Sequence, residues 1–152
     1  DARVINEQNS AKGIEEIQAD PFRGSGTVHN PELEMVEARK NIDFFANLKA
    51  QMWWSLRMRF QNTYRALQGM QYDPDALISL STEDLDKREL EQLKRELSQP
   101  TYSKNGAGKI LVNKQPDGAL SPNRADSVMI CFSDIRERKR KKPAGAGSRT
   151  YQ

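Results

Sequence analysis

The 152-residue sequence contains one cysteine, Cys131, and one histidine, His29. A single cysteine excludes an internal disulfide, and neither residue has the partners that a zinc site needs. Cys131 falls in an apolar stripe, so we expect a small buried core residue and not a nucleophile. The sequence has no run of about 18 apolar residues and no charged-then-apolar amino terminus, so it predicts no membrane span and no secretory signal. A cytoplasmic protein that is not secreted fits these absences.

A nucleotide-binding loop is also missing. The segment 20–26 contains two glycines and one proline, which predicts a loop, but no Gly-Lys-Ser/Thr sequence follows it. Neither of the Walker segments of an ATPase is present. ATP is therefore not an expected cofactor of this chain.

Positive charge is unevenly distributed. The net charge is +3, but the run 136–142 holds six basic residues and one acid, so the rest of the chain is slightly acidic. Such a run can neutralise the phosphates of nucleic acid, or it can be an ordinary solvated terminus. We expect one domain over 1–135 and a basic, flexible tail over 136–152. The candidate DNA contacts in this tail are Arg136, Arg138, Lys139, Arg140, Lys141 and Lys142.

Apolar periodicity predicts one long helix over 43–67. Its apolar side chains recur every three or four residues from Phe45 to Leu67, and Trp53 and Trp54 widen the apolar face. This spacing favours packing in a core, against a sheet, over stacking on nucleic-acid bases. Gly69 is the expected end of the helix.

Shorter elements surround this helix. The polar segment 1–13 predicts a short helix, 14–19 a strand, and the charged segment 31–40 a further helix. Ser81 is the expected N-cap of a surface helix that ends before Pro100.

Two extended runs, 101–103 and 109–114, flank an Asn-Gly turn and predict a β-hairpin. Three lysines would give the hairpin a basic edge. Lys104, Lys109 and Lys114 are therefore candidate DNA contacts.

The segment Ser121–Phe132 predicts a last helix with one acid on the edge of an apolar face. Ser121 is a suitable N-cap, and Pro122 suits the first helical position. Asp126 lies beside the apolar stripe, where a carboxylate is costly to bury without compensation. A divalent metal would compensate it, and so would a basic side chain from elsewhere. The helix dipole also favours an acid in this turn, which leaves a structural role open.

The segment Ser121–Ser127, which reads SPNRADS, resembles a segment near the end of tailed-phage terminase large subunits. Asn47–Arg57, which reads NLKAQMWWSLR, is similar to a tryptophan-containing helix of the same family. Between them, a leucine series and the strand 109–114 follow the family's order and spacing. The resemblance covers roughly 14–135 and corresponds to the carboxy-terminal part of the nuclease domain.

This resemblance implies an α/β protein with a ribonuclease H-like fold, in which helices flank a mixed sheet that is incomplete here. It also implies an endonuclease that cuts concatemeric viral DNA during packaging, with Mg²⁺ or Mn²⁺ ions held by carboxylates. Asp126 matches the last of these ligands. The resemblance also implies three partners: double-stranded DNA, the terminase small subunit and the portal protein. It implies a location in the bacterial host cytoplasm. In this family ATP binds to the motor domain, which is absent here.

The other metal-binding acids of the family are not visible in this sequence. One acid cannot hold two metals, so we expect the chain by itself to be inactive or very weak as a nuclease. Two other interpretations stay open. The chain can be a non-catalytic DNA- or portal-binding module, or an inactive prophage remnant.

Overall fold

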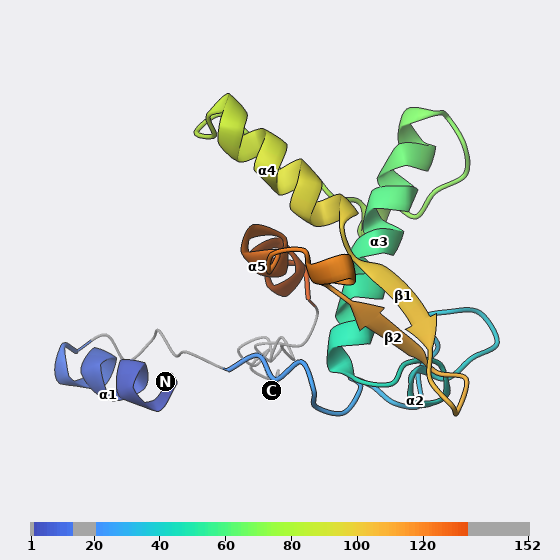
Figure 1. Cartoon of the computed structure of the whole chain (residues 1–152), viewed down its shortest axis with the longest axis horizontal. Helices are drawn as coiled ribbons and strands as arrows, with labels where there is room; N and C mark the ends of the chain where they lie inside the picture. Colours follow the sequence, from blue (N-terminus) through green and yellow to red (C-terminus); the bar gives the residue numbers. More distant parts are fainter. Residues whose placement is uncertain (1, 14–20, 134–152) are drawn as a thin grey trace, which may run out of the picture.

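A computed structural model of the chain describes residues 2–13 and 21–133. The short amino-terminal helix is confirmed, whereas the strand predicted over 14–19 and the basic tail lie outside the described residues. In chain order the elements are α1 (Ala2–Ala11), α2 (Asn41–Phe44), α3 (Leu48–Leu67), η1 (Pro74–Ala76), α4 (Lys87–Ser98), β1 (Thr101–Lys104), β2 (Ile110–Asn113), η2 (Pro116–Gly118) and α5 (Asn123–Cys131) (Figure 1).

The long predicted helix is α3, but it begins later than predicted. Asn47 is its N-cap, and its side chain accepts a hydrogen bond from the Ala50 amide at 2.9 Å. Phe45 adopts an extended conformation between α2 and α3 and forms an isolated parallel bridge with Ile110. The helix ends as predicted, because Gly69 takes up a positive φ of 67° that L-residues rarely adopt.

The predicted helix over 31–40 is wrong. This segment consists of turns, with an isolated bridge between Val36 and Arg39. The buried Asn41 side chain explains the difference, because it binds backbone groups that a helix would bind internally. It accepts from the Met35 amide at 3.0 Å and donates to the Asn30 carbonyl at 2.9 Å.

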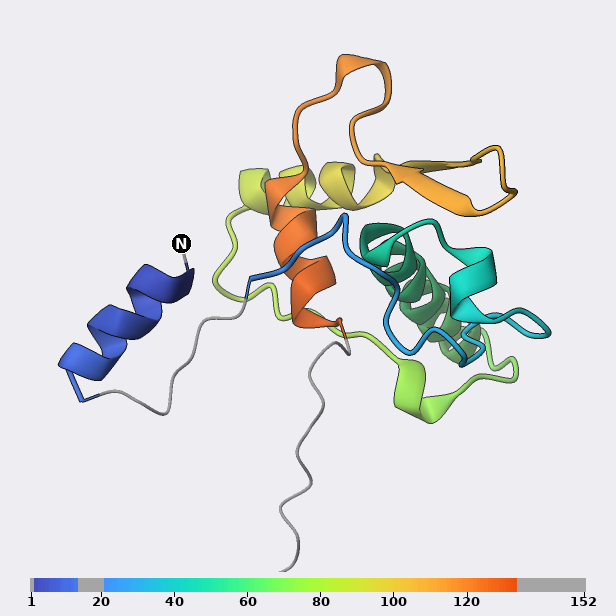
Figure 2. The same cartoon turned by 90° about the horizontal axis from the view of Figure 1, so that it is seen from below.

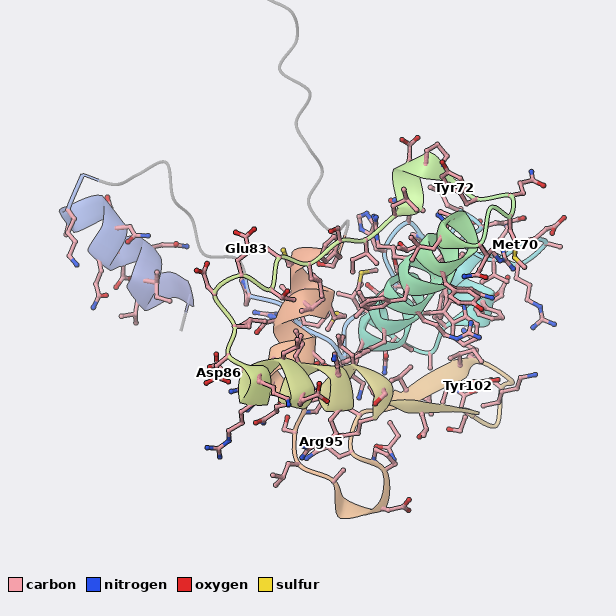
Figure 3. All side chains as sticks on the ribbon, turned by 90° about the horizontal axis from the view of Figure 1, so that it is seen from above. Met70, Tyr72, Glu83, Asp86, Arg95 and Tyr102 are labelled. Atoms are coloured by element: carbon pink, nitrogen blue, oxygen red, sulfur yellow. The ribbon has the colours of Figure 1, made fainter. Side chains whose placement is uncertain are left out.

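The predicted surface helix exists as α4 but does not begin at Ser81. Its N-cap is Asp86, whose carboxylate accepts from the Glu89 amide at 2.8 Å. Asp86 competes successfully with Ser81 because a carboxylate at the helix start also gains from the helix dipole. Figure 3 labels Asp86 at the start of this helix and Arg95 further along it.

The predicted hairpin is confirmed. β1 and β2 pair antiparallel, with Tyr102 opposite Val112 and Lys104 opposite Ile110. The Phe45–Ile110 bridge adds a parallel contact on β2. Among the described residues the sheet therefore has two antiparallel strands and one isolated parallel contact, as expected of an incomplete mixed sheet.

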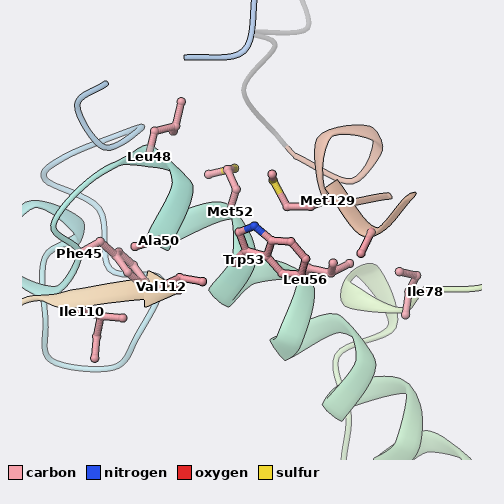
Figure 4. Packing of buried hydrophobic residues seen from close by; sticks show 11 residues of the cluster. Phe45, Leu48, Ala50, Met52, Trp53, Leu56, Ile78, Ile110, Val112 and Met129 are labelled. Carbon is pink, nitrogen blue, oxygen red and sulfur yellow. The ribbon is translucent and has the colours of Figure 1, made fainter. Parts of the chain in front are cut away.

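The core lies between α3, β2 and α5. Figure 4 shows the close packing of its side chains. α3 contributes one face, so the prediction that its apolar face packs in a core is confirmed. The buried hydrophobic residues are Phe45, Leu48, Ala50, Met52, Trp53, Leu56, Ile78, Ile110, Val112, Ala125 and Met129.

Three residues predicted for the core, Phe60, Leu67 and Cys131, are exposed. Leu67 is 78% exposed because the last turn of α3 extends beyond the elements that cover its first half. Cys131 is also exposed, which makes the prediction of a buried cysteine wrong. It is the last residue of α5, where the helix has passed the core contacts of Ala125 and Met129.

Candidate metal and DNA site

The first turn of α5 is capped from another helix. Ser121 does not provide the predicted side-chain cap, because Pro122 takes the N-cap position and no side chain of the segment caps the turn. Glu96, on α4, supplies the acceptor instead. Its Oε2 accepts from the amides of Arg124 at 2.7 Å and Ala125 at 3.2 Å. Figure 2 shows α4 crossing close to the start of α5.

Glu96 remains charged although its side chain is only 8% exposed. Burial by itself raises the pKa of a carboxyl group, but the amide of Ala125, the side chain of Gln92 and the amide of Arg124 all donate to this one. These hydrogen bonds, together with the Arg124 guanidinium, outweigh burial and hold the pKa of Glu96 below its ordinary value. The buried charge is therefore stabilised by its contacts with α5.

Asp126 lies directly after this capped turn and is largely buried. Its Oδ2 binds the ammonium of Lys114, and the two side chains are 21% and 24% exposed. Its Oδ1 is buried and has no hydrogen-bond partner. A buried carboxylate oxygen without a donor is costly. The structure therefore provides a basic partner for Asp126, and it leaves the other, buried oxygen of this carboxylate without a donor.

The described residues do not place Asp126 in a complete cluster of metal ligands. Over 2–13 and 21–133 no group of three or more histidine, cysteine, aspartate or glutamate side chains is close enough to hold a metal ion. Oxygen ligands of the Asp126 type suit Mg²⁺ and Mn²⁺. Asp126 fits one position in such a site, and the remaining ligands must come from other residues.

The structure separates the three hairpin lysines. Lys104 is exposed at the end of β1, and Lys109 is partly buried beside the turn. Lys114 points to Asp126. The six basic residues proposed for the tail lie outside the described part of the chain.

An apolar groove lies apart from Asp126, between α3, the end of α4 and β1. Trp54 and Tyr102 meet there edge to face, with ring centroids 5.4 Å apart. Trp54 also lies under the Arg57 guanidinium, 5.0 Å from the ring centroid. Figure 3 labels Tyr102 on the hairpin. The groove is lined by Trp53, Trp54, Leu56, Arg57, Phe60, Lys94, Leu97, Ser98, Pro100, Thr101, Tyr102 and Val112.

Sequence reasoning missed the role of Glu96. Its position in a charged surface helix carries no sign of burial, because the amides that it binds belong to residues 28 and 29 positions later. The sequence carries no signal of this contact, because Ser121 is a suitable N-cap and only the structure shows that Pro122 takes that position.

No protein-family model and no curated protein matches the chain. Solved structures do match, among them nuclease domains of the large terminase subunit gp2 of bacterial virus Sf6. One of them is a variant of that domain with manganese and β-thujaplicinol. The match covers 87% of this chain and 60% of the terminase chain, at 32% sequence identity and a TM-score of 0.74. The match to a second structure of this nuclease domain covers 74% of this chain and 51% of the terminase chain, at 34% sequence identity and a TM-score of 0.66. The chain has the fold of a terminase nuclease domain.

A third terminase structure, a variant with calcium, matches 74% of this chain at 34% identity and a TM-score of 0.65. The chain spans about 60% of the first terminase structure and about half of the other two. This agrees with an incomplete ribonuclease H-like α/β fold, which the sequence predicted. None of the helices in 2–13 and 21–133 has the length and apolar character needed to cross a membrane.

Proposed function

We propose that this chain is part of a terminase large subunit, an endonuclease that cuts concatemeric viral DNA during packaging. The observation that carries the proposal is the position of Asp126 within a terminase nuclease fold. Its Oδ1 is buried without a donor, and its Oδ2 is held by Lys114. Two of the matching terminase structures contain manganese or calcium, which supports the proposal that a nuclease domain of this fold binds a divalent metal ion.

Asp126 would bind a Mg²⁺ or Mn²⁺ ion through Oδ1. In the bound state, divalent ions lower the pKa of water and stabilise the leaving oxygen of the cut phosphodiester. Lys114 keeps the carboxylate in one orientation by holding Oδ2, and the capped first turn of α5 fixes the backbone of Asp126. No group of three or more potential metal ligands lies together among the described residues, so we expect the chain by itself to be inactive or very weak.

The proposed DNA contacts lie on the hairpin and in the tail. Lys104 is the most accessible of the hairpin lysines, and Lys109 lies beside the turn. Lys114 is a weaker candidate because its ammonium already binds Asp126. In the intact protein the partners would be double-stranded DNA, the small subunit and the portal protein, in the bacterial host cytoplasm. ATP would bind to the motor domain.

The test is Mn²⁺-dependent cleavage of plasmid DNA by the protein that is encoded by the complete reading frame containing this chain. We expect cleavage by the unaltered protein and a loss of about 100-fold or more in Asp126→Asn, because a metal ligand is removed. Asp117→Asn is the matched control, since Asp117 is an exposed acid in the η2 turn. Equal cleavage by the Asp126→Asn variant and the unaltered protein would contradict the proposal.

A non-catalytic DNA-binding module is the second candidate, favoured by the absence of a complete acidic cluster among the described residues. The salt dependence of DNA binding separates the two functions. A binding module would bind DNA equally well with Asp126→Asn, would cleave nothing in Mn²⁺, and would lose about one unit of salt slope in Lys104→Gln.

A further inference from the structure

The start of α5 lacks a cap of its own. In an ordinary helix, the side chain at the N-cap accepts hydrogen bonds from the amides of the second or third helical residue. Pro122 occupies the N-cap of α5 and carries no acceptor in its side chain. The second and third helical residues are Arg124 and Ala125, and Ala125 is fully buried. Water therefore cannot replace the missing cap at Ala125.

Glu96 supplies both of these hydrogen bonds from α4. One oxygen, Oε2, lies 2.7 Å from the Arg124 nitrogen and 3.2 Å from the Ala125 nitrogen. These are the two amides that an N-cap side chain would bind. The negative charge also lies at the positive end of the α5 dipole, which strengthens the contact.

The other oxygen of Glu96 holds the carboxylate in this orientation. Oε1 accepts from the Gln92 side chain at 3.1 Å, one helical turn earlier on α4. It also lies 3.6 Å from the Arg124 guanidinium. The carboxylate is thus fixed on both sides, by α4 and by the first turn of α5.

We infer that Glu96 is a positioning residue for the metal site, which acts on Asp126 through the backbone of the first α5 turn. Asp126 follows Ala125 directly, so a displacement of the Ala125 amide moves the Asp126 backbone with it. This inference rests on the proposed function, because a positioning role requires that Asp126 binds the metal. Glu96 itself does not contact Asp126 in the structure.

Two measurements test the inference. The first is amide hydrogen exchange in the 152-residue chain, followed by NMR at Arg124 and Ala125. We expect exchange about tenfold faster in Glu96→Ala and an intermediate value in Glu96→Gln, whose amide oxygen can still accept a hydrogen bond. The second is the Mn²⁺ concentration for half-maximal plasmid cleavage by the full reading-frame protein. We expect it to rise about tenfold in Glu96→Gln, with the KM for DNA unchanged.

Glu91→Gln is the matched control. It removes the same charge from the same helix, but Glu91 is 56% exposed and pairs with Lys94 at 2.9 Å. Exchange and Mn²⁺ dependence should stay at the values of the unaltered protein. If Glu96→Ala does not fold, Glu96→Gln decides the matter.

Failure of the inference differs from failure of the proposed function. If the unaltered protein cleaves DNA and Glu96→Gln has an unchanged Mn²⁺ dependence, the positioning role is wrong and the nuclease function stands. Unchanged exchange at both amides would contradict the cap itself. If the unaltered protein does not cleave at any Mn²⁺ concentration, the proposed function fails and the positioning role fails with it.

Discussion

Three buried polar side chains, Asn41, Gln51 and Glu96, each bind the backbone of a distant segment. Asn41 holds the turns before α2, and Glu96 caps α5. Gln51 accepts from the His29 amide at 2.6 Å and donates to the His29 carbonyl at 2.9 Å. A buried polar group that loses its partner costs about 1–3 kcal/mol. These single side chains therefore have a large influence on loop structure.

The lowered pKa of Glu96 makes the free energy of unfolding depend on pH. Because its pKa is lowered in the folded protein, its contribution is complete above the ordinary carboxyl value and is lost as the pH falls through the folded value. We expect Glu96→Gln to be less stable than the unaltered chain at pH 7. The difference should shrink as the pH falls below about 4. Urea unfolding at both pH values measures this, and a difference independent of pH would contradict it.

Gln51 allows a test of what a buried side-chain amide contributes to stability. Gln51→Met keeps the volume but leaves the His29 amide without its acceptor, so it should lower the unfolding free energy by about 1–3 kcal/mol. Gln61→Met, at an exposed position of the same helix, is the control and should change it little. Thermal and urea unfolding of both variants decide the matter.

At the scale of elements, helix boundaries follow the best available cap. Asn47 starts α3 later than apolar periodicity predicts, and Asp86 starts α4 later than the predicted N-cap Ser81. The hairpin turn shows the same local control, because the Asn105 side chain accepts from the amides of Ala107 and Lys109 at 3.0 Å each. The turn is therefore built around Asn105 and closes at Gly108.

Gly108 is the glycine that this turn requires. Its φ is 75°, whereas Gly106 does not have a positive φ, and an added Cβ would meet nothing within 4 Å at either position. Gly108→Ala should therefore lower the unfolding free energy by about 1–2 kcal/mol through backbone strain alone. Gly106→Ala should be close to neutral. Equal effects in urea unfolding would show that the strain does not lie at Gly108.

At the scale of the molecule, the chain has the fold of part of a terminase nuclease domain. The chain spans about 60% of the first matching structure. Most of the basic residues that we proposed as DNA contacts lie in the run 136–142, outside the described residues. The candidate metal ligand Asp126 and most of the candidate DNA contacts therefore lie in different parts of the chain.

Removal of residues 136–152 should separate these parts. We expect the slope of log affinity for DNA against log salt concentration to become smaller by about three or more, because seven basic residues are lost, Arg149 and the six of the run 136–142. The melting temperature should stay the same, since the core lies within the described residues. Fluorescence anisotropy with a short DNA duplex measures the slope. An unchanged slope would show that the tail does not contact phosphates.

The local chemistry of the sequence was sufficient for several features. Apolar periodicity identified α3 and its core face, the Asn-Gly segment identified the hairpin, and Gly69 marked the end of α3. The SPNRADS segment and the tryptophan-containing helix identified the family. Each of these features depends on neighbours along the chain, so a single sequence contains the necessary information.

Tertiary structure decided what depends on residues far apart in sequence. The Lys114–Asp126 pair, the Glu96 cap on α5 and the Asn41 contact with Asn30 are interactions of this kind. Periodicity describes which face of an element is apolar, but it does not specify which polar group of another element will meet that face. The sequence by itself therefore determined the family resemblance and the candidate ligand Asp126. The ion pair with Lys114 and the packing of α4 against α5, which only the tertiary structure shows, decided how that side chain is held.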